Sequence, residues 1–190
     1  AQSAASMASA APGRFVLGLG TSSNVIVERW NGIGFEAPYA RVRDTVRFLR
    51  AAFTGEKVTE SYESFDIAGF RLGNVPDEAP PIVVAALREG MLRLAGREAD
   101  GAVVNWLSVD DATTVTAIVR DAAAAADRPE PEVAARLFVC PSPDRDAVVA
   151  QAKRLVAAYV NVPVYRAFHE WMGRTDVLDE HWERWDAGDR

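Results

Sequence analysis

The chain has 190 residues, of which 49% are hydrophobic and 25% charged, and its net charge at pH 7 is −6. This composition is typical of a globular domain that is long enough for one sizeable core. The acidic balance and the presence of only two lysines exclude a broad basic face, so we expect no nucleic-acid partner. No run of about 18 apolar residues exists in the sequence, so we expect no membrane-spanning helix.

The single cysteine, Cys140, excludes a framework of internal disulfides, and we expect a cytoplasmic protein in which this residue is small and buried. Residues 1–15 lack both the basic segment and the apolar core of a signal peptide. There is no initiator Met and no capping signal before the helix-like start, which suggests that residues precede this chain.

The hydrophobic pattern predicts strands that alternate with helices. A helix ends near Pro12-Gly13, and a long loop is expected at 21–37. The strands are expected at 14–19, 81–86, 101–106 and 133–139, and the helices at 38–53, 89–97, 109–126 and 144–159.

Two further segments interrupt or follow this alternation. Residues 56–79 form an excursion with a small hairpin, whose strands we place at 64–67 and 70–72 around a turn at Ala68-Gly69. The aromatic segment from residue 161 onward is predicted to be helical.

Alternating strands and helices indicate a parallel sheet with crossover helices, and strands that are apolar throughout indicate cover on both faces. In such folds ligands bind beyond the carboxyl ends of the strands. The turns expected to face a ligand are therefore 20–24, 87–90, 105–108 and 140–142.

The first of these turns has the most specific chemistry. Gly18 and Gly20 allow a sharp turn and close approach of the backbone to a ligand, and the hydroxyls that follow can donate to an anion. The dinucleotide fingerprint fits poorly, because Ser23 replaces its third glycine and no acidic residue follows about 20 residues later. Two interpretations remain open here, an anion cradle or glycines that serve packing alone.

Two other turns offer polar groups. Arg88 can pair with a phosphate at the start of the next helix, or it can be an ordinary surface residue. Asn105 and Trp106 present an amide and an indole, although Trp106 also suits a core or rim position. His169 and His181 do not have metal-ligand spacing, so we expect no metal site.

Two stretches resemble a known family. RFVLGLGTSSNVIVERWNGIGFE and PPIVVAALREGMLRLAGREADGAVVNWLS are similar to the luciferase-like monooxygenase superfamily, and most similar to its oxidoreductases that use the deazaflavin coenzyme F-420. The resemblance implies an α/β fold, namely part of a TIM-type (β/α)8 barrel. Residues 1–190 would form a single incomplete barrel domain with strands four to seven, an insertion at 56–79 and a helical tail at 161–190.

The resemblance also implies a cofactor site at the strand ends. The cofactor's side chain and phosphate would lie near Gly20, Thr21, Ser22, Ala86, Leu87, Arg88 and Gly90, and its ring or polar arm near Asn105 and Trp106. Many relatives have Gly-Pro at the positions of Arg88 and Glu89, so the phosphate contacts differ here. The catalytic residues are unknown, because much of that machinery lies on the early strands that this chain lacks.

The resemblance therefore implies an oxidoreductase that moves a hydride between a reduced deazaflavin and a small organic substrate. One alternative keeps the fold but uses FMN and oxygen, as a monooxygenase. Another is a non-catalytic fragment or a self-association module whose exposed sheet edges pair. We expect a homodimer. A sugar-isomerase type of barrel is disfavoured, because the required Lys and His residues are absent from the strand ends.

Overall fold

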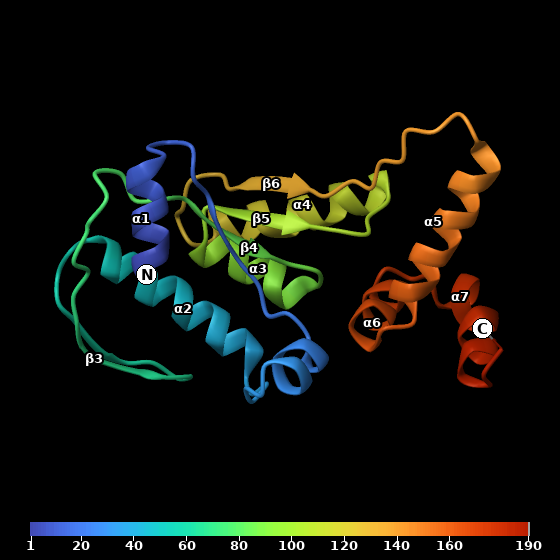
Figure 1. Ribbon diagram of the computed structural model, residues 1–190, viewed down its shortest axis with the longest axis horizontal. Helices are drawn as coiled ribbons and strands as arrows, with labels where there is room; N and C mark the ends of the chain where they lie inside the picture. The colour runs from blue at the N-terminus through green and yellow to red at the C-terminus, as the bar shows by residue number, and fades with distance from the viewer. Residues whose placement is uncertain (190) are drawn as a thin grey trace. The chain divides into compact units, whose positions relative to one another are not determined.

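The structure is a computed structural model that describes residues 1–189, and the chain divides into two compact units that meet in sequence at residues 136 and 137. The first unit contains a four-stranded parallel sheet with the strand order β1-β4-β5-β6 (Figure 1). Its strands are β1 (Leu17–Leu19), β4 (Ile82–Ala85), β5 (Gly101–Val104) and β6 (Glu132–Ala135). The predicted parallel α/β arrangement is confirmed for this unit.

The helices of the first unit follow local sequence signals. They are α1 (Gln2–Ala10), α2 (Pro38–Phe53), α3 (Glu89–Glu98) and α4 (Val109–Ala124). Pro38 occupies the first turn of α2, where its missing N–H costs nothing, and Gly55 follows the helix with a φ of +81°. These two residues fix the start and the end of α2 where the sequence predicted them.

The helices form one layer against one face of the sheet, with α3 packed between α2 and α4. Ile82 and Val84 are fully buried on that face, whereas Val83 and Ala85 on the opposite face are partly or fully exposed. We expected cover on both faces, but residues 1–136 provide it on one. The strand sequences do not distinguish the covered face from the open one, because the open face is also built from Val, Ala and Gly.

The helix layer depends on close contact between α3 and α4. A Cβ atom on Gly96 of α3 would overlap the backbone oxygen of Val119 on α4. Around this crossing, Leu92, Val115 and Val119 have no exposed surface. The packing therefore requires a glycine at position 96.

The small hairpin lies within the predicted excursion but has different strands. β2 (Val58–Ser61) pairs with β3 (Asp66–Phe70), so the predicted turn at Ala68-Gly69 is wrong. Gly69 instead has a φ of +70° inside β3, where the register shifts, and its N–H donates to Thr59 Oγ1 at 2.9 Å. A glycine with positive φ within a strand marks a bulge.

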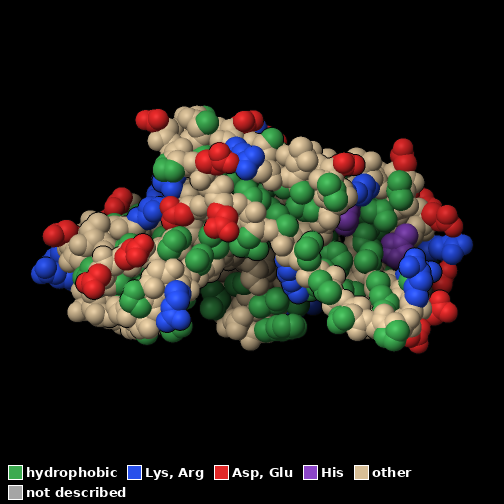
Figure 2. Space-filling model, turned by 90° about the horizontal axis from the view of Figure 1, so that it is seen from above, with side chains coloured by type: hydrophobic (Ala, Val, Ile, Leu, Met, Phe, Trp, Pro, Cys, Tyr) green, Lys and Arg blue, Asp and Glu red, His purple; other side chains and the backbone are tan. Residues whose placement is uncertain are grey.

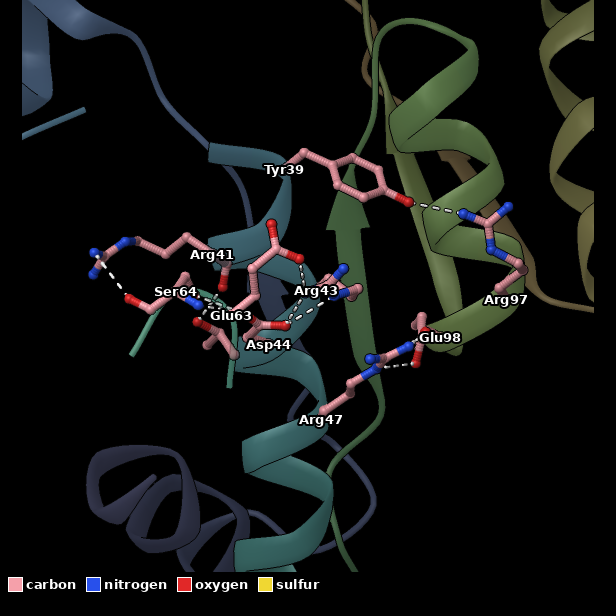
Figure 3. Close-up of polar contacts among 10 residues, drawn as sticks. Tyr39, Arg41, Arg43, Asp44, Arg47, Glu63, Ser64, Arg97 and Glu98 are labelled. Carbon is pink, nitrogen blue, oxygen red and sulfur yellow. Dashed lines mark hydrogen bonds and ion pairs between the residues drawn. The ribbon is translucent and has the colours of Figure 1, made fainter. Parts of the chain in front are cut away.

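A buried carboxylate joins this hairpin to α2 (Figure 3). Asp44 is 1% exposed, and its Oδ2 accepts hydrogen bonds of 2.9 Å from both the backbone N–H and the hydroxyl of Ser64. Arg43 pairs with Asp44 at 2.7 Å and with Glu63 at 2.9 Å. These hydrogen bonds fix the hairpin turn on the helix.

The segment expected as a loop at 21–37 contains a short π-helix, η1 (Val25–Trp30). None of its residues is buried, and Trp30 is 73% exposed. Contacts within the segment hold it, including a 2.8 Å hydrogen bond from Asn31 Nδ2 to the Ile26 oxygen. Helical periodicity could not predict this element, because the expected pattern has 3.6 residues per turn.

The second unit contains α5 (Arg145–Val160), α6 (Pro163–Trp171) and α7 (Thr175–Asp186). Phe168 and Trp182 are its main buried aromatic residues, and Trp182 Nε1 donates to the Val160 oxygen at 3.1 Å. The unit begins just after β6, which ends at Ala135 instead of the predicted residue 139. Cys140 is exposed, so its predicted burial is wrong.

None of the helices in residues 1–189 has the length and apolar character needed to cross a membrane. On the face drawn in Figure 2, acidic and basic side chains are interspersed with hydrophobic ones.

Candidate functional site at the carboxyl ends of the strands

Three of the predicted turns meet at one edge of the sheet. Gly20 follows β1, Ala86 follows β4 and Asn105 follows β5, and these three strands are parallel neighbours. A Cβ on Gly20 would lie 3.1 Å from the Cβ of Ala85, which shows how closely the first two strands approach. The N–H of Ala86 donates to the Val103 oxygen at 3.0 Å and joins the second turn to the third strand.

Two of these turns contain residues with left-handed backbone conformation. Ser22 after β1 has a φ of +60°, and Trp106 after β5 has a φ of +61°. This conformation is rare for residues with side chains and costs on the order of 1–3 kcal/mol. Nearby polar groups stabilise both turns: Thr21 Oγ1 donates to the Ser22 oxygen at 3.2 Å, and Trp106 N–H donates to Asn105 Oδ1 at 3.0 Å.

The second turn leads into the amino terminus of α3. Arg88 is the N-cap residue of this helix, with extended backbone and no side-chain cap, so N–H groups of the first turn remain available. Within residues 1–189 the exposed Arg88 side chain makes no hydrogen bond or ion pair, and no atom would lie within 4 Å of a Cβ on Gly90. The predicted residue Leu87 is half-buried beside them.

The acidic neighbour of Arg88 has a partner of its own. Glu89 accepts from Arg93 one helical turn later, with a closest ion-pair distance of 2.7 Å. The positive end of the helix dipole and the guanidinium of Arg88 therefore act together on any anion bound here.

Sequence reasoning missed the anchor of the third turn. Ser108 caps α4, where its hydroxyl accepts from the Asp111 N–H at 3.2 Å and its own N–H donates to Asp111 Oδ2 at 2.7 Å. Asp111 is 6% exposed, so this capping box fixes the chain two residues after Trp106. The signal was present in the sequence as Ser-x-x-Asp.

The fourth predicted turn, 140–142, lies in the second unit, where Cys140 Sγ is 4.0 Å from Gln151 Oε1.

The first three turns offer hydroxyls, backbone N–H groups and one guanidinium. They suit an anionic group better than a cation. Among residues 1–189, no cluster of three or more His, Cys, Asp or Glu is placed to hold a metal ion.

Comparison with known protein families identifies the family of this chain. The family model described as luciferase-like monooxygenase matches residues 1–190, and the chain belongs to this family. The expected partial barrel is confirmed: the chain aligns with about half of several luciferase-like structures.

Among the curated relatives, the chain is 30% identical over 153 residues to the 5,10-methylenetetrahydromethanopterin reductase of Methanolobus tindarius, covering 78% of this chain and 45% of the relative. It is 36% identical over 105 residues to the F420-dependent glucose-6-phosphate dehydrogenase of Mycobacterium avium, covering 53% and 31% respectively. The chain thus spans less than half the length of these relatives.

Two solved structures share the fold at low sequence identity. An F420-dependent secondary alcohol dehydrogenase in complex with an F420-acetone adduct has a TM-score of 0.75 and 18% identity, over 83% of this chain and 49% of that one. The coenzyme F420-dependent tetrahydromethanopterin reductase from Methanopyrus kandleri has a TM-score of 0.71 and 21% identity, over 83% and 50%.

Proposed function

We propose that this chain forms the cofactor-binding part of an oxidoreductase that transfers a hydride between reduced coenzyme F-420 and a small organic substrate. The observation that carries the proposal is the meeting of three donor-rich turns at the carboxyl edge of one parallel sheet. Support for the deazaflavin comes from the relatives and neighbours, whose names include F420-dependent reductases and dehydrogenases.

The residues present fit the charged arm of such a cofactor. Arg88, the first turn of α3 and the open space beside Gly90 would hold the phosphate, because they combine a free guanidinium with unpaired N–H groups. The backbone and hydroxyls of Gly20, Thr21 and Ser22 would contact the adjacent polar chain. When it is bound, the cofactor supplies the hydride chemistry.

The chain's own residues would orient the cofactor and limit its contact with water. Trp106 is half-buried and is followed by Leu107, which packs against the core, so its indole would form an apolar wall for the ring. Asn105 already accepts from the Trp106 N–H, and its side-chain NH2 group remains to donate toward the ring's polar arm. No general acid or base is assigned to these turns.

A titration of the chain with oxidised coenzyme F-420 and, separately, with FMN tests the proposal. We expect saturable quenching of deazaflavin fluorescence and weaker binding of FMN. FMN is the relevant competitor, because a Type II Baeyer-Villiger monooxygenase in complex with FMN shares this fold with a TM-score of 0.55. Tight binding of FMN without binding of the deazaflavin would assign the chain to the monooxygenases, and binding of neither would favour a non-catalytic fragment.

We also propose a cytoplasmic, homodimeric protein that acts on a small molecule. An exposed, unpaired Cys140 is compatible with a reducing compartment. The net charge of −6 favours a small-molecule substrate over a nucleic acid.

A further inference from the structure

The turn between β5 and α4 breaks the alternation of side chains that a strand imposes. In an extended strand, residues three positions apart point to opposite faces of the sheet. Val104 at the end of β5 is 2% exposed in the core, and Leu107, three residues later, also packs against the core. Both residues can do so only if the backbone departs from the extended conformation between them. Trp106, with a φ of +61°, is the residue at which it does.

Both ends of this turn are fixed by hydrogen bonds. On the strand side, the Val104 oxygen accepts from the Arg136 N–H at 2.9 Å, which continues the pairing of β5 with β6. On the helix side, the Ser108 N–H donates to Asp111 Oδ2 at 2.7 Å, and the Asp111 N–H donates to Ser108 Oγ at 3.2 Å. Residues 105–107 alone join these two anchors, and so short a segment has few conformations that satisfy both ends.

Asp111 is the stronger half of the helix-side anchor. Ser108 is exposed, so water can replace its hydroxyl, whereas the carboxylate of Asp111 is buried. A buried, charge-assisted hydrogen bond is strong, and it can offset the conformational cost of a left-handed residue that has a side chain. Without this bond, Trp106 would relax toward the conformations that such residues prefer.

We propose that Asp111 is a positioning residue for the cofactor ring and acts through Trp106. By holding the Ser108 N–H, it maintains the left-handed conformation of Trp106 and the direction in which the indole leaves the backbone. Asn105 belongs to the same arrangement, because its Oδ1 accepts from the Trp106 N–H at 3.0 Å. This role rests on the proposed function, in which the amide of Asn105 and the indole of Trp106 face the ring.

The first test follows Trp106 directly and needs no cofactor. In the chain labelled with fluorotryptophan, the fluorine resonance of Trp106 is assigned by its loss in Trp106→Phe. We expect this resonance to shift or broaden in Asp111→Ala and to stay in place in Asp110→Ala. Asp110 is a matched control, because it carries the same charge on the first turn of α4 but is exposed and lies outside the capping box. An unchanged Trp106 resonance in Asp111→Ala overturns the proposal.

The second test is a double-mutant cycle read by deazaflavin fluorescence. Asp111→Ala should raise the dissociation constant for oxidised coenzyme F-420 by about five- to tenfold, since fewer molecules then hold Trp106 in the binding-competent conformation. Trp106→Ala should also raise it, and adding Asp111→Ala to that variant should cause no further change, because the residue through which Asp111 acts is gone. A full further loss in the double variant overturns the proposal.

The conservative variant Asp111→Asn separates geometry from charge. Its amide oxygen can still accept from the Ser108 N–H, so the affinity should stay within about twofold of that of the unsubstituted chain. Equal losses in Asp111→Asn and Asp111→Ala overturn the proposal, because the negative charge would then be responsible.

Circular dichroism checks that each variant is folded. If Asp111→Ala is unfolded, Ser108→Ala takes its place, since it removes the hydroxyl that accepts from the Asp111 N–H. The Trp106 resonance should shift in this variant too, and an unshifted resonance overturns the proposal. Failure of the proposed function is a separate outcome: absence of cofactor binding by the unsubstituted chain overturns both proposals, whereas an unchanged fluorine resonance overturns this one alone.

Discussion

The amino and carboxyl ends of the parallel strands differ in whether their polar groups have hydrogen-bond partners. At the amino ends of the strands, Asp100 accepts from the Ile82 N–H at 2.8 Å, from Arg50 at 2.7 Å and from Arg128 at 3.2 Å. At the carboxyl ends, Arg88 has no partner among the described residues, and Ser22 adopts a left-handed conformation. One end satisfies its polar groups internally, while the other leaves donors available and retains strain.

This difference separates residues that hold the fold from residues that are available for a ligand. In barrels of this type, stability residues concentrate at the amino end and ligand-binding residues at the carboxyl end. Changes at the first end should therefore alter the free energy of unfolding, whereas changes at the second should alter cofactor affinity alone.

The sharpest test compares two glycines on α3. Gly96→Ala should lower the free energy of unfolding by about 3 kcal/mol, because the added methyl overlaps the Val119 backbone. Gly90→Ala should leave stability unchanged or raise it by about 0.5 kcal/mol, since its Cβ enters open space and alanine favours the helix. Urea unfolding measures both. An equal decrease in the free energy of unfolding in the two variants would contradict the assignment of Gly90 to an open site.

The amino end is tested by Asp100→Ala. This change removes the acceptor from one backbone N–H and two arginines, and we expect a loss of about 2–3 kcal/mol in the free energy of unfolding. Asp121→Ala, at an exposed position on α4, is the control and should change stability by less than about 0.5 kcal/mol. Thermal unfolding with the same midpoint for both variants would refute the role of Asp100.

The carboxyl end is tested by Arg88→Ala. Loss of one charged hydrogen bond should weaken cofactor binding by about 1.5–3 kcal/mol, with no change in stability. Arg97→Ala removes the same charge from the last turn of α3, where the arginine donates to Tyr39 Oη at 2.8 Å, and should alter cofactor affinity little. Fluorescence titration of both variants makes the comparison. Unchanged affinity in Arg88→Ala would remove this residue from the site.

The buried carboxylate beneath the hairpin predicts a pH dependence. Burial alone would raise the pKa of Asp44, but hydrogen bonds from Arg43 and Ser64 outweigh it and hold the pKa below its ordinary value of 3.8. A lowered folded-state pKa means that the stabilisation is complete above about pH 4 and is lost as the pH falls through the folded value.

Asp44→Asn should therefore lower stability by about 1 kcal/mol at pH 7 and reduce the difference between pH 7 and pH 3. Urea titrations at the two pH values measure this difference, with Asp66→Asn at an exposed position of β3 as the comparison. An unchanged pH dependence in Asp44→Asn would show that Asp44 does not couple protonation to folding.

Much of the fold could be predicted because several local signals agree. Pro38 and Gly55 bound α2, and apolar runs after loops locate all four strands. The hairpin was misplaced because Gly69 indicates equally a turn or a bulge, and only pairing with β2 decides between them. The sequence did not predict that β6 ends at Ala135, because the apolar run continues to residue 139 and a sequence does not distinguish exposed from buried apolar residues.

The location of the candidate site could be predicted from the sequence because the sheet is parallel. Parallel strands bring their carboxyl ends to one edge, so the sequence alone groups Gly20, Ala86 and Asn105. The left-handed Trp106 could not be foreseen, because residues with side chains rarely adopt that conformation. The lack of a partner for Arg88 among the described residues also required the structure, in which the adjacent Glu89 pairs with Arg93.

The position of β1 in the sheet has a consequence for folding. β4, β5 and β6 follow one another closely in sequence, whereas β1 joins β4 only after α2 and the hairpin intervene. Such a long loop closure is slow and its contacts form late, so β1 should also be the strand that opens first. Amide hydrogen exchange should thus be fastest in β1. A ligand bound by Gly20–Ser22 should slow exchange selectively in β1, because it would hold this strand on the sheet.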